Sequence, residues 1–140
     1  MKIFVDTNVL IAVLNKQYPL FPYAARILSL SDHARFKLYT SPICLAIAFY
    51  FAEKKSGTEQ ARKKIALLAD KLEIATTDIE TVRSTVANRA IHDFEDGLEY
   101  YAAIQSGCKV IVSEDVADFY FSNIPVQNCA DFLSSKLSNK

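Results

Sequence analysis

The sequence is poor in the residues that mark fibrous, disordered or disulfide-rich chains. Its 140 residues include no tryptophan, three glycines, four prolines and three cysteines, while 51% are hydrophobic. So little glycine and proline excludes collagen-like and low-complexity chains, and the high apolar content argues against disorder. A chain of this length is large enough to bury one core of its own. We therefore expect a compact soluble fold with a single domain spanning residues 1–140.

The few sulfur and imidazole groups give no sign of a zinc site. Cys44, Cys108 and Cys129 are odd in number, widely spaced and set among apolar neighbours. This usage is typical of reduced thiols buried in a core, where free cysteine behaves as a small hydrophobic side chain. His33 and His92 lack the spacing of metal ligands.

Neither the charge balance nor the hydropathy pattern announces a nucleic-acid or membrane partner. Sixteen basic residues balance sixteen acidic ones, so any nucleic acid would have to be held locally. The longest run without charge, residues 38–52, is shorter than the roughly 20 apolar residues that span a bilayer. The first residues do not have the pattern of a secretory signal. A cytoplasmic location without a membrane partner is the expectation.

Strand and helix patterns alternate along the chain. A short apolar run typical of a buried strand stands at residues 3–5, and a second buried strand, ending in two acids, is expected over residues 109–115. The segments between the strands carry apolar residues at helical spacing. Strands alternating with helices are typical of an α/β fold with parallel strands. The sequence predicts a three-layer sandwich in which helices flank a central, mostly parallel sheet.

Acidic residues close two of these strands. Asp6 closes the first strand, and Asp115 closes the second. Ligand sites of open parallel sheets lie beyond the carboxyl ends of the strands, so these two carboxylates are expected to approach each other. Unpaired, they would repel, and carboxylate oxygens suit Mg²⁺ or Mn²⁺ better than zinc.

A helix in the last third supplies further acidic candidates. Asp93 and Asp96 are three residues apart and share a helix face. Each acid also has a purely structural interpretation: Asp6 can cap the helix that follows it, and the acids near residue 95 can be favourable charges in a first helical turn. Three acidic sites on three elements at one predicted sheet edge favour the functional interpretation.

Four segments in this order resemble the PIN-domain nucleases, which include the VapC-like toxins of bacterial toxin–antitoxin pairs. They are "IFVDTNVLIAVL" at the start, "DFEDGLEYYAAIQSG" and "VIVSEDVADF" in the last third, and the closing "IPVQNCADFL". The resemblance covers nearly the whole chain. It implies an endoribonuclease that hydrolyses RNA phosphodiester bonds with Mg²⁺ or Mn²⁺, and with it an RNA substrate, an antitoxin protein as partner and self-association as a homodimer.

The resemblance also implies roles for individual residues. The acidic ligands of the family fall on Asp6, Asp96 and Asp115, which become the expected catalytic and metal-binding residues, with Asp93 as a further candidate ligand. A polar neighbour of the first ligand and a supporting hydroxyl would match a second pair of positions, Asn8 and Ser113. The residues that bind RNA are not indicated.

One position departs from the family pattern. The family usually carries a glutamate in the helix after the second strand, and here that region offers Ile47 and Ala48, with Glu53 about a turn and a half later. The departure implies weaker metal binding or a relocated second metal. It favours one alternative, a catalytically weakened PIN-fold binding module. A structure-specific DNA nuclease is a second alternative, because a fold does not fix the substrate.

Candidate RNA contacts are weaker. Lys54, Lys55 and residues 62–64 form the only dense basic run, and either phosphate binding or a solvated helix face would explain it. Tyr100 and Tyr101 could stack on bases, although aromatic residues at helical spacing more often belong to a core.

Overall fold

The computed structural model describes residues 1–137, and its strands form one five-stranded sheet of order β3-β2-β1-β4-β5. Every strand pair in it is parallel. The strands are β1 (Lys2–Val5), β2 (Lys37–Thr40), β3 (Glu73–Ile74), β4 (Val110–Val112) and β5 (Val126–Gln127). The predicted α/β architecture is confirmed, and the sheet is parallel throughout its described strands.

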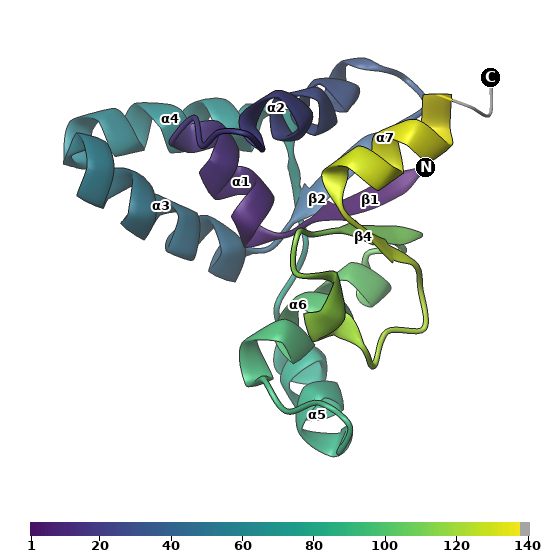
Figure 1. The fold of residues 1–140 in the computed structure, drawn as a ribbon. Helices are drawn as coiled ribbons and strands as arrows, with labels where there is room; N and C mark the ends of the chain where they lie inside the picture. Colours follow the sequence, from purple (N-terminus) through teal and green to yellow (C-terminus); the bar gives the residue numbers. More distant parts are fainter. Residues whose placement is uncertain (138–140) are drawn as a thin grey trace.

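Helices cover both faces of this sheet, which makes the three layers of the sandwich (Figure 1). One face carries α1 (Thr7–Leu14), α2 (Phe21–Ser29), α3 (Pro42–Ser56), α4 (Thr58–Lys71) and α7 (Cys129–Leu137), and the other carries α5 (Ile79–Ala87) and α6 (Phe94–Gln105). Two short 3-10 helices, η1 (Leu30–Asp32) and η2 (Val116–Phe119), lie between these elements.

The central strand β1 explains why the sheet is buried. Ile3, Phe4 and Val5 are fully buried, as are Ile111 and Val112 of the neighbouring β4. Strands covered on both faces need continuous apolar runs rather than alternating ones, and "KIFV" and "VIV" have this pattern. The core therefore lies on both sides of β1 and β4.

The strand order reverses at β1, because β2 and β3 lie on one side of it and β4 and β5 lie on the other. The segment after β1 crosses one face to reach β2, while β4 follows helices α5 and α6 on the other face. A crevice forms at such a switch point, beyond the carboxyl ends of the two central strands. The backbone N–H of Asp6 donates to the carbonyl of Val112 at 3.0 Å, so these two strand ends are fixed beside each other.

Capping residues mark both ends of α3 and the start of α5. Ser41 caps α3 by accepting from the N–H of Cys44, and Asp78 and Thr81 form a capping box at the start of α5. Gly57, with φ of 84°, separates α3 from α4. A residue with a side chain would be strained at that φ, which is why glycine ends α3.

None of the helices within residues 1–137 has the length and apolar character needed to cross a membrane.

Candidate metal centre

Asp6 is the centre of a hydrogen-bonded group at the carboxyl ends of β1 and β4. Its side chain is nearly buried and accepts from the N–H of Thr7 at 2.7 Å, which makes it the N-cap of α1. Its other oxygen, Oδ2, accepts from the hydroxyl of Ser113 at 2.6 Å. Asp6 thus has the structural role of a cap, and it also faces the acidic residues described below.

The side chain of Asn8 is hydrogen-bonded to the loop after β4. Its side-chain amide donates to Asp115 Oδ2 at 3.0 Å and to Ser113 Oγ at 3.3 Å, and its carbonyl oxygen accepts from the N–H of Glu114. The structure thus brings Asn8, Ser113 and Asp115 into one network with Asp6, at the edge where the sequence placed them. Glu114 is directed away, toward the N–H of Cys129 at the start of α7.

The N-terminus of α6 brings two more acids to this edge. Asp93 is the N-cap of α6 and accepts from the N–H groups of Glu95 and Asp96. Burial, followed by the charges of Asp93 and Asp6, raises the pKa of Asp96 to about 7. The same causes raise the pKa of Glu95. These acids repel one another at neutral pH, which is the condition that a bound cation would relieve.

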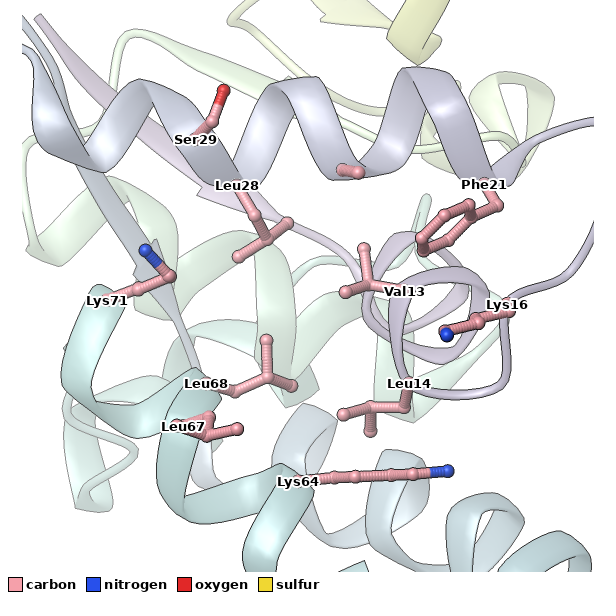
Figure 2. A pocket seen from close by; sticks show the side chains of 11 residues that line it. Val13, Leu14, Lys16, Phe21, Leu28, Ser29, Lys64, Leu67, Leu68 and Lys71 are labelled. Atoms are coloured by element: carbon pink, nitrogen blue, oxygen red, sulfur yellow. The ribbon is translucent and has the colours of Figure 1, made fainter.

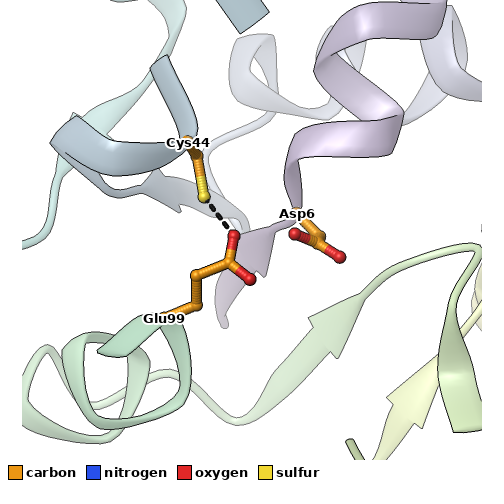
Figure 3. A group of neighbouring side chains, drawn as sticks. All are labelled: Asp6, Cys44 and Glu99. Atoms are coloured by element: carbon orange, nitrogen blue, oxygen red, sulfur yellow. Dashed lines mark hydrogen bonds between the residues drawn. The ribbon is translucent and has the colours of Figure 1, made fainter. Parts of the chain in front are cut away.

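Glu99, one turn further along α6, is a site residue that the sequence interpretation missed. It is 2% exposed, and its Oε1 accepts from Cys44 Sγ at 2.5 Å and from Thr7 Oγ1 at 3.3 Å. Burial, then the proximity of Cys44 and Asp6, holds its pKa well above the usual range of a glutamate. Figure 3 shows Glu99 reaching from α6 toward Cys44 on α3, with Asp6 beside them.

Cys44 was expected to be a buried core thiol, and its burial is confirmed together with that of Cys108 and Cys129. Its contact with a carboxylate was not expected. Asp6, Cys44 and Glu99 each offer a ligand atom, and these atoms lie within 4.8 Å of one another. Among residues 1–137 no other group of three acids, cysteines or histidines is this tight.

The donor atoms of this edge fit a divalent cation. Asp6, Asp96 and Glu99 present carboxylates, and the two ion pairs found within residues 1–137, Lys71–Asp32 and Arg83–Glu80, lie elsewhere. Crowded carboxylates without a cationic side chain are stabilised by hydrogen-bond donors, by protons or by a metal ion. Whether Asp6, Asp96, Asp115 and Asp93 are ligands stays a prediction.

The glutamate expected on the helix after β2 has no substitute on that helix. Glu53 lies near the far end of α3, where its Oε2 accepts from the hydroxyl of Thr58 at 2.9 Å. Ile47 is half-buried, and Cys44 is the residue of α3 that reaches the acids.

The structure also shows where the tyrosines and the basic run lie that were considered as RNA contacts. Tyr100 is 4% exposed and Tyr101 is half-buried, with its hydroxyl accepting from Asn88, so both belong to the packing of α6. The basic run lies where α3 meets α4: Lys55 donates to the carbonyl of Asn15, and Lys64 donates to Ser56 at 3.0 Å.

The fold and the site together define an α/β protein with a parallel sheet and acidic residues beyond the carboxyl ends of its central strands. The PIN domain family model matches residues 2–117. The chain belongs to the PIN domain family.

Individual relatives agree with this assignment. Ribonuclease VapC1 of Aquifex aeolicus (strain VF5) is 25% identical over 134 residues, which cover 94% of this chain and 92% of the relative. The crystal structure of VapBC2 from Rickettsia felis, bound to a DNA fragment from its promoter, has a TM-score of 0.71 at 20% identity, covering 91% of this chain and 98% of that one. VapC20 of Mycobacterium tuberculosis, a sarcin-ricin loop cleaving toxin, has a TM-score of 0.62 at 16% identity, covering 78% and 86%.

Proposed function

We propose that this protein is a metal-dependent endoribonuclease and the toxin of a toxin–antitoxin pair. The observation that carries the proposal is the group of carboxylates beyond β1 and β4, led by Asp6 and Asp96, which pair with no cationic side chain among residues 1–137. Membership of the PIN family and the similarity to a VapC1 ribonuclease support the same activity. The proposed location is the cytoplasm, whose reducing conditions suit three buried free thiols.

The proposed ligands are Asp6, Asp96 and Asp115, with Asp93 beside them. A bound Mg²⁺ or Mn²⁺ would supply a water of lowered pKa and charge neutralisation at the phosphate. The chain's own part is to hold these carboxylates in place. Ser113 fixes Asp6 through a 2.6 Å hydrogen bond, and Asn8 fixes Asp115 through one of 3.0 Å. No side-chain nucleophile is needed in this scheme.

The RNA is proposed to approach over exposed aromatic rings beside the acids. The rings of His92 and Tyr120 stack with 5.8 Å between their centroids, and the hydroxyl of Tyr120 accepts from the backbone N–H of His92. Tyr120 and Phe94 are 56% and 52% exposed, and both border the N-terminus of α6. Unpaired bases stack well on such rings, whereas a regular duplex does not offer its bases. This arrangement supports single-stranded or looped RNA as the substrate.

An apolar pocket between α1, α2 and α4 is the proposed antitoxin site. It has a volume of about 340 Å³. Figure 2 shows Leu14, Phe21 and Leu68 facing this pocket, with Lys16, Lys64 and Lys71 at its rim. An apolar floor with a cationic rim suits a peptide segment that carries both apolar and acidic side chains. The similarity to VapBC2 supports a protein partner of this kind.

The deciding experiment is cleavage of labelled single-stranded and structured RNAs across a titration of Mg²⁺ and Mn²⁺. We expect metal-dependent cleavage that falls at least about a hundredfold in Asp96→Asn, because a metal ligand is lost. Asp70→Asn, an exposed acid on α4, is the matched control and should cleave normally. Undiminished cleavage by a folded Asp96→Asn protein would remove Asp96 from the site.

The same assay separates the alternatives. Preferential cleavage of flapped DNA would favour a structure-specific DNA nuclease. A folded protein that cleaves nothing at any metal concentration would favour a binding module. Sedimentation of the protein alone and with an acidic, apolar peptide tests the proposed homodimer and the proposed antitoxin partner.

A further inference from the structure

The buried group of Asp6, Cys44 and Glu99 combines two carboxylates with a thiol. The three side chains come from three elements: the end of β1, the first turn of α3 and the second turn of α6 (Figure 3). Cys44 is fully buried, Glu99 is 2% exposed and Asp6 is 6% exposed. Three polar groups have thus been withdrawn from water at one point.

No cationic side chain among residues 1–137 pairs with this group, because the ion pairs there join other residues. A buried charge is normally paired or bound to a metal. The hydroxyl of Thr7 and the thiol of Cys44 both donate to the same oxygen of Glu99. These two donors position Glu99, but neither is a cation, so the Glu99 carboxyl is neutral unless a metal ion binds to it.

The spacing of the group suits a small divalent ion. Zinc and ions of similar size bind sulfur at about 2.3 Å and carboxylate oxygen at about 2.0 to 2.2 Å, so two ligands of one ion lie at most about 4.5 Å apart. The ligand atoms of Asp6, Cys44 and Glu99 lie within 4.8 Å of one another. This span is slightly wider than that limit, so a bound ion would draw the three side chains closer together.

We infer that Asp6, Cys44 and Glu99 form a sulfur-containing inner metal site that takes a thiophilic divalent ion of the Zn²⁺ or Co²⁺ class. Glu99 on α6 thereby takes the place of the glutamate that is absent from α3. Asp6 borders both this inner site and the outer acids Asp96 and Asp115. The inference rests on the proposed function for its catalytic meaning, but metal binding itself is independent of it.

Sulfur determines which ion the inner site prefers. Thiolate ligands favour zinc, cobalt and similar metals, whereas Mg²⁺ takes oxygen ligands. When an ion binds, the Cys44 thiol and the Glu99 carboxyl would each lose a proton to solvent, and bonds from the sulfur and the carboxylate to the metal would replace the S–H···O bond between them. An excess of Mg²⁺ should therefore fail to displace the ion from this position.

Cobalt absorption tests the inference directly, because a sulfur-to-cobalt charge-transfer band appears only when a thiolate binds the ion. The wild-type protein should show this band on titration with Co²⁺ and keep it in excess Mg²⁺. Cys44→Ser should lose the band, and Cys108→Ser, which changes a buried thiol elsewhere, should retain it. Glu99→Gln should weaken Co²⁺ binding at least about tenfold, the loss that even a partner of a metal ligand causes.

Folding, metal binding and activity are measured separately. Circular dichroism shows whether each variant is folded, and equilibrium dialysis gives the number of ions bound. A folded wild-type protein without the band, or a Cys44→Ser variant that keeps it, would overturn the inference. A band without RNA cleavage would leave the inner site intact and count against the proposed nuclease, while cleavage without a band would do the reverse.

Discussion

Replacing Asp96 by asparagine should stabilise the metal-free protein at alkaline pH. The pKa of this carboxyl rises from 3.8 to about 7 in the folded state, through burial and through the charges of Asp93, Asp6, Asp118 and Glu95. The folded protein therefore holds this proton more tightly than the unfolded chain. Its contribution to stability is full below pH 3.8 and is lost as the pH rises to about 7.

The size of the effect follows from the same pKa. At 1.36 kcal/mol per pKa unit, the rise corresponds to an upper limit of about 4 kcal/mol. Asp96 is only half-buried, so solvent screening reduces the expected figure to about 1–2 kcal/mol. Asparagine has nearly the same shape and no charge, so Asp96→Asn should gain this amount at pH 8 and less than half of it at pH 5.

Urea unfolding at both pH values, with a chelator present, measures the difference. Adding Mn²⁺ should reverse the order of stability at pH 8, because the wild-type protein binds the ion more tightly, and ion at 100 times its Kd stabilises by about 2.7 kcal/mol. Asp70→Asn should show neither change. A metal-free Asp96→Asn protein that is less stable at pH 8, or equally changed at both pH values, would refute the electrostatic argument.

Three further predictions concern packing, substrate and partner. Gly97→Ala should reduce the free energy of unfolding by about 1–3 kcal/mol in urea titrations, because its Cβ would lie 2.4 Å from Thr85 Cγ2; an unchanged midpoint would show that α5 moves aside without strain. Tyr120→Ala should raise KM for looped RNA severalfold with little change in kcat, and an unaltered KM in steady-state cleavage would exclude stacking on this ring. Leu67→Asp places a negative charge on an exposed leucine of the pocket in Figure 2 and should weaken binding of an acidic, apolar peptide at least about tenfold in calorimetry; undiminished binding would place the partner elsewhere.

Local patterns were sufficient to predict the fold. The apolar run of β1 and the helical spacing after it predicted a parallel sheet with helices on both faces. The structure has this arrangement. Capping was equally informative: Asp6 was expected to be able to cap the helix that follows it, and it caps α1. Element ends were less certain, since the strand expected over residues 109–115 is only Val110–Val112.

The candidate site could be predicted only where it follows strand ends. Asp6 and Asp115 follow strand ends, so topology predicted that they lie at one edge of the sheet. The family resemblance added Ser113, which the structure joins to Asp6 by a 2.6 Å hydrogen bond. Asp93 also has a purely structural role, because it is the N-cap of α6.

Glu99 and Cys44 could not be predicted because their meeting depends on the distance between two helices on opposite faces of the sheet. In the sequence, Glu99 stands among apolar residues of α6, three positions after Asp96, which places it one turn from that acid on the same helix face. This spacing was the available signal, and the missing acid on α3 was the reason to look for it. Cys44 has the apolar neighbours of an ordinary core thiol, and only the packing of α3 against the sheet edge gives it a carboxylate as a neighbour. The inferred metal role of Glu99 and Cys44 therefore depends on a contact between two distant segments of the chain, and neither segment indicates it alone.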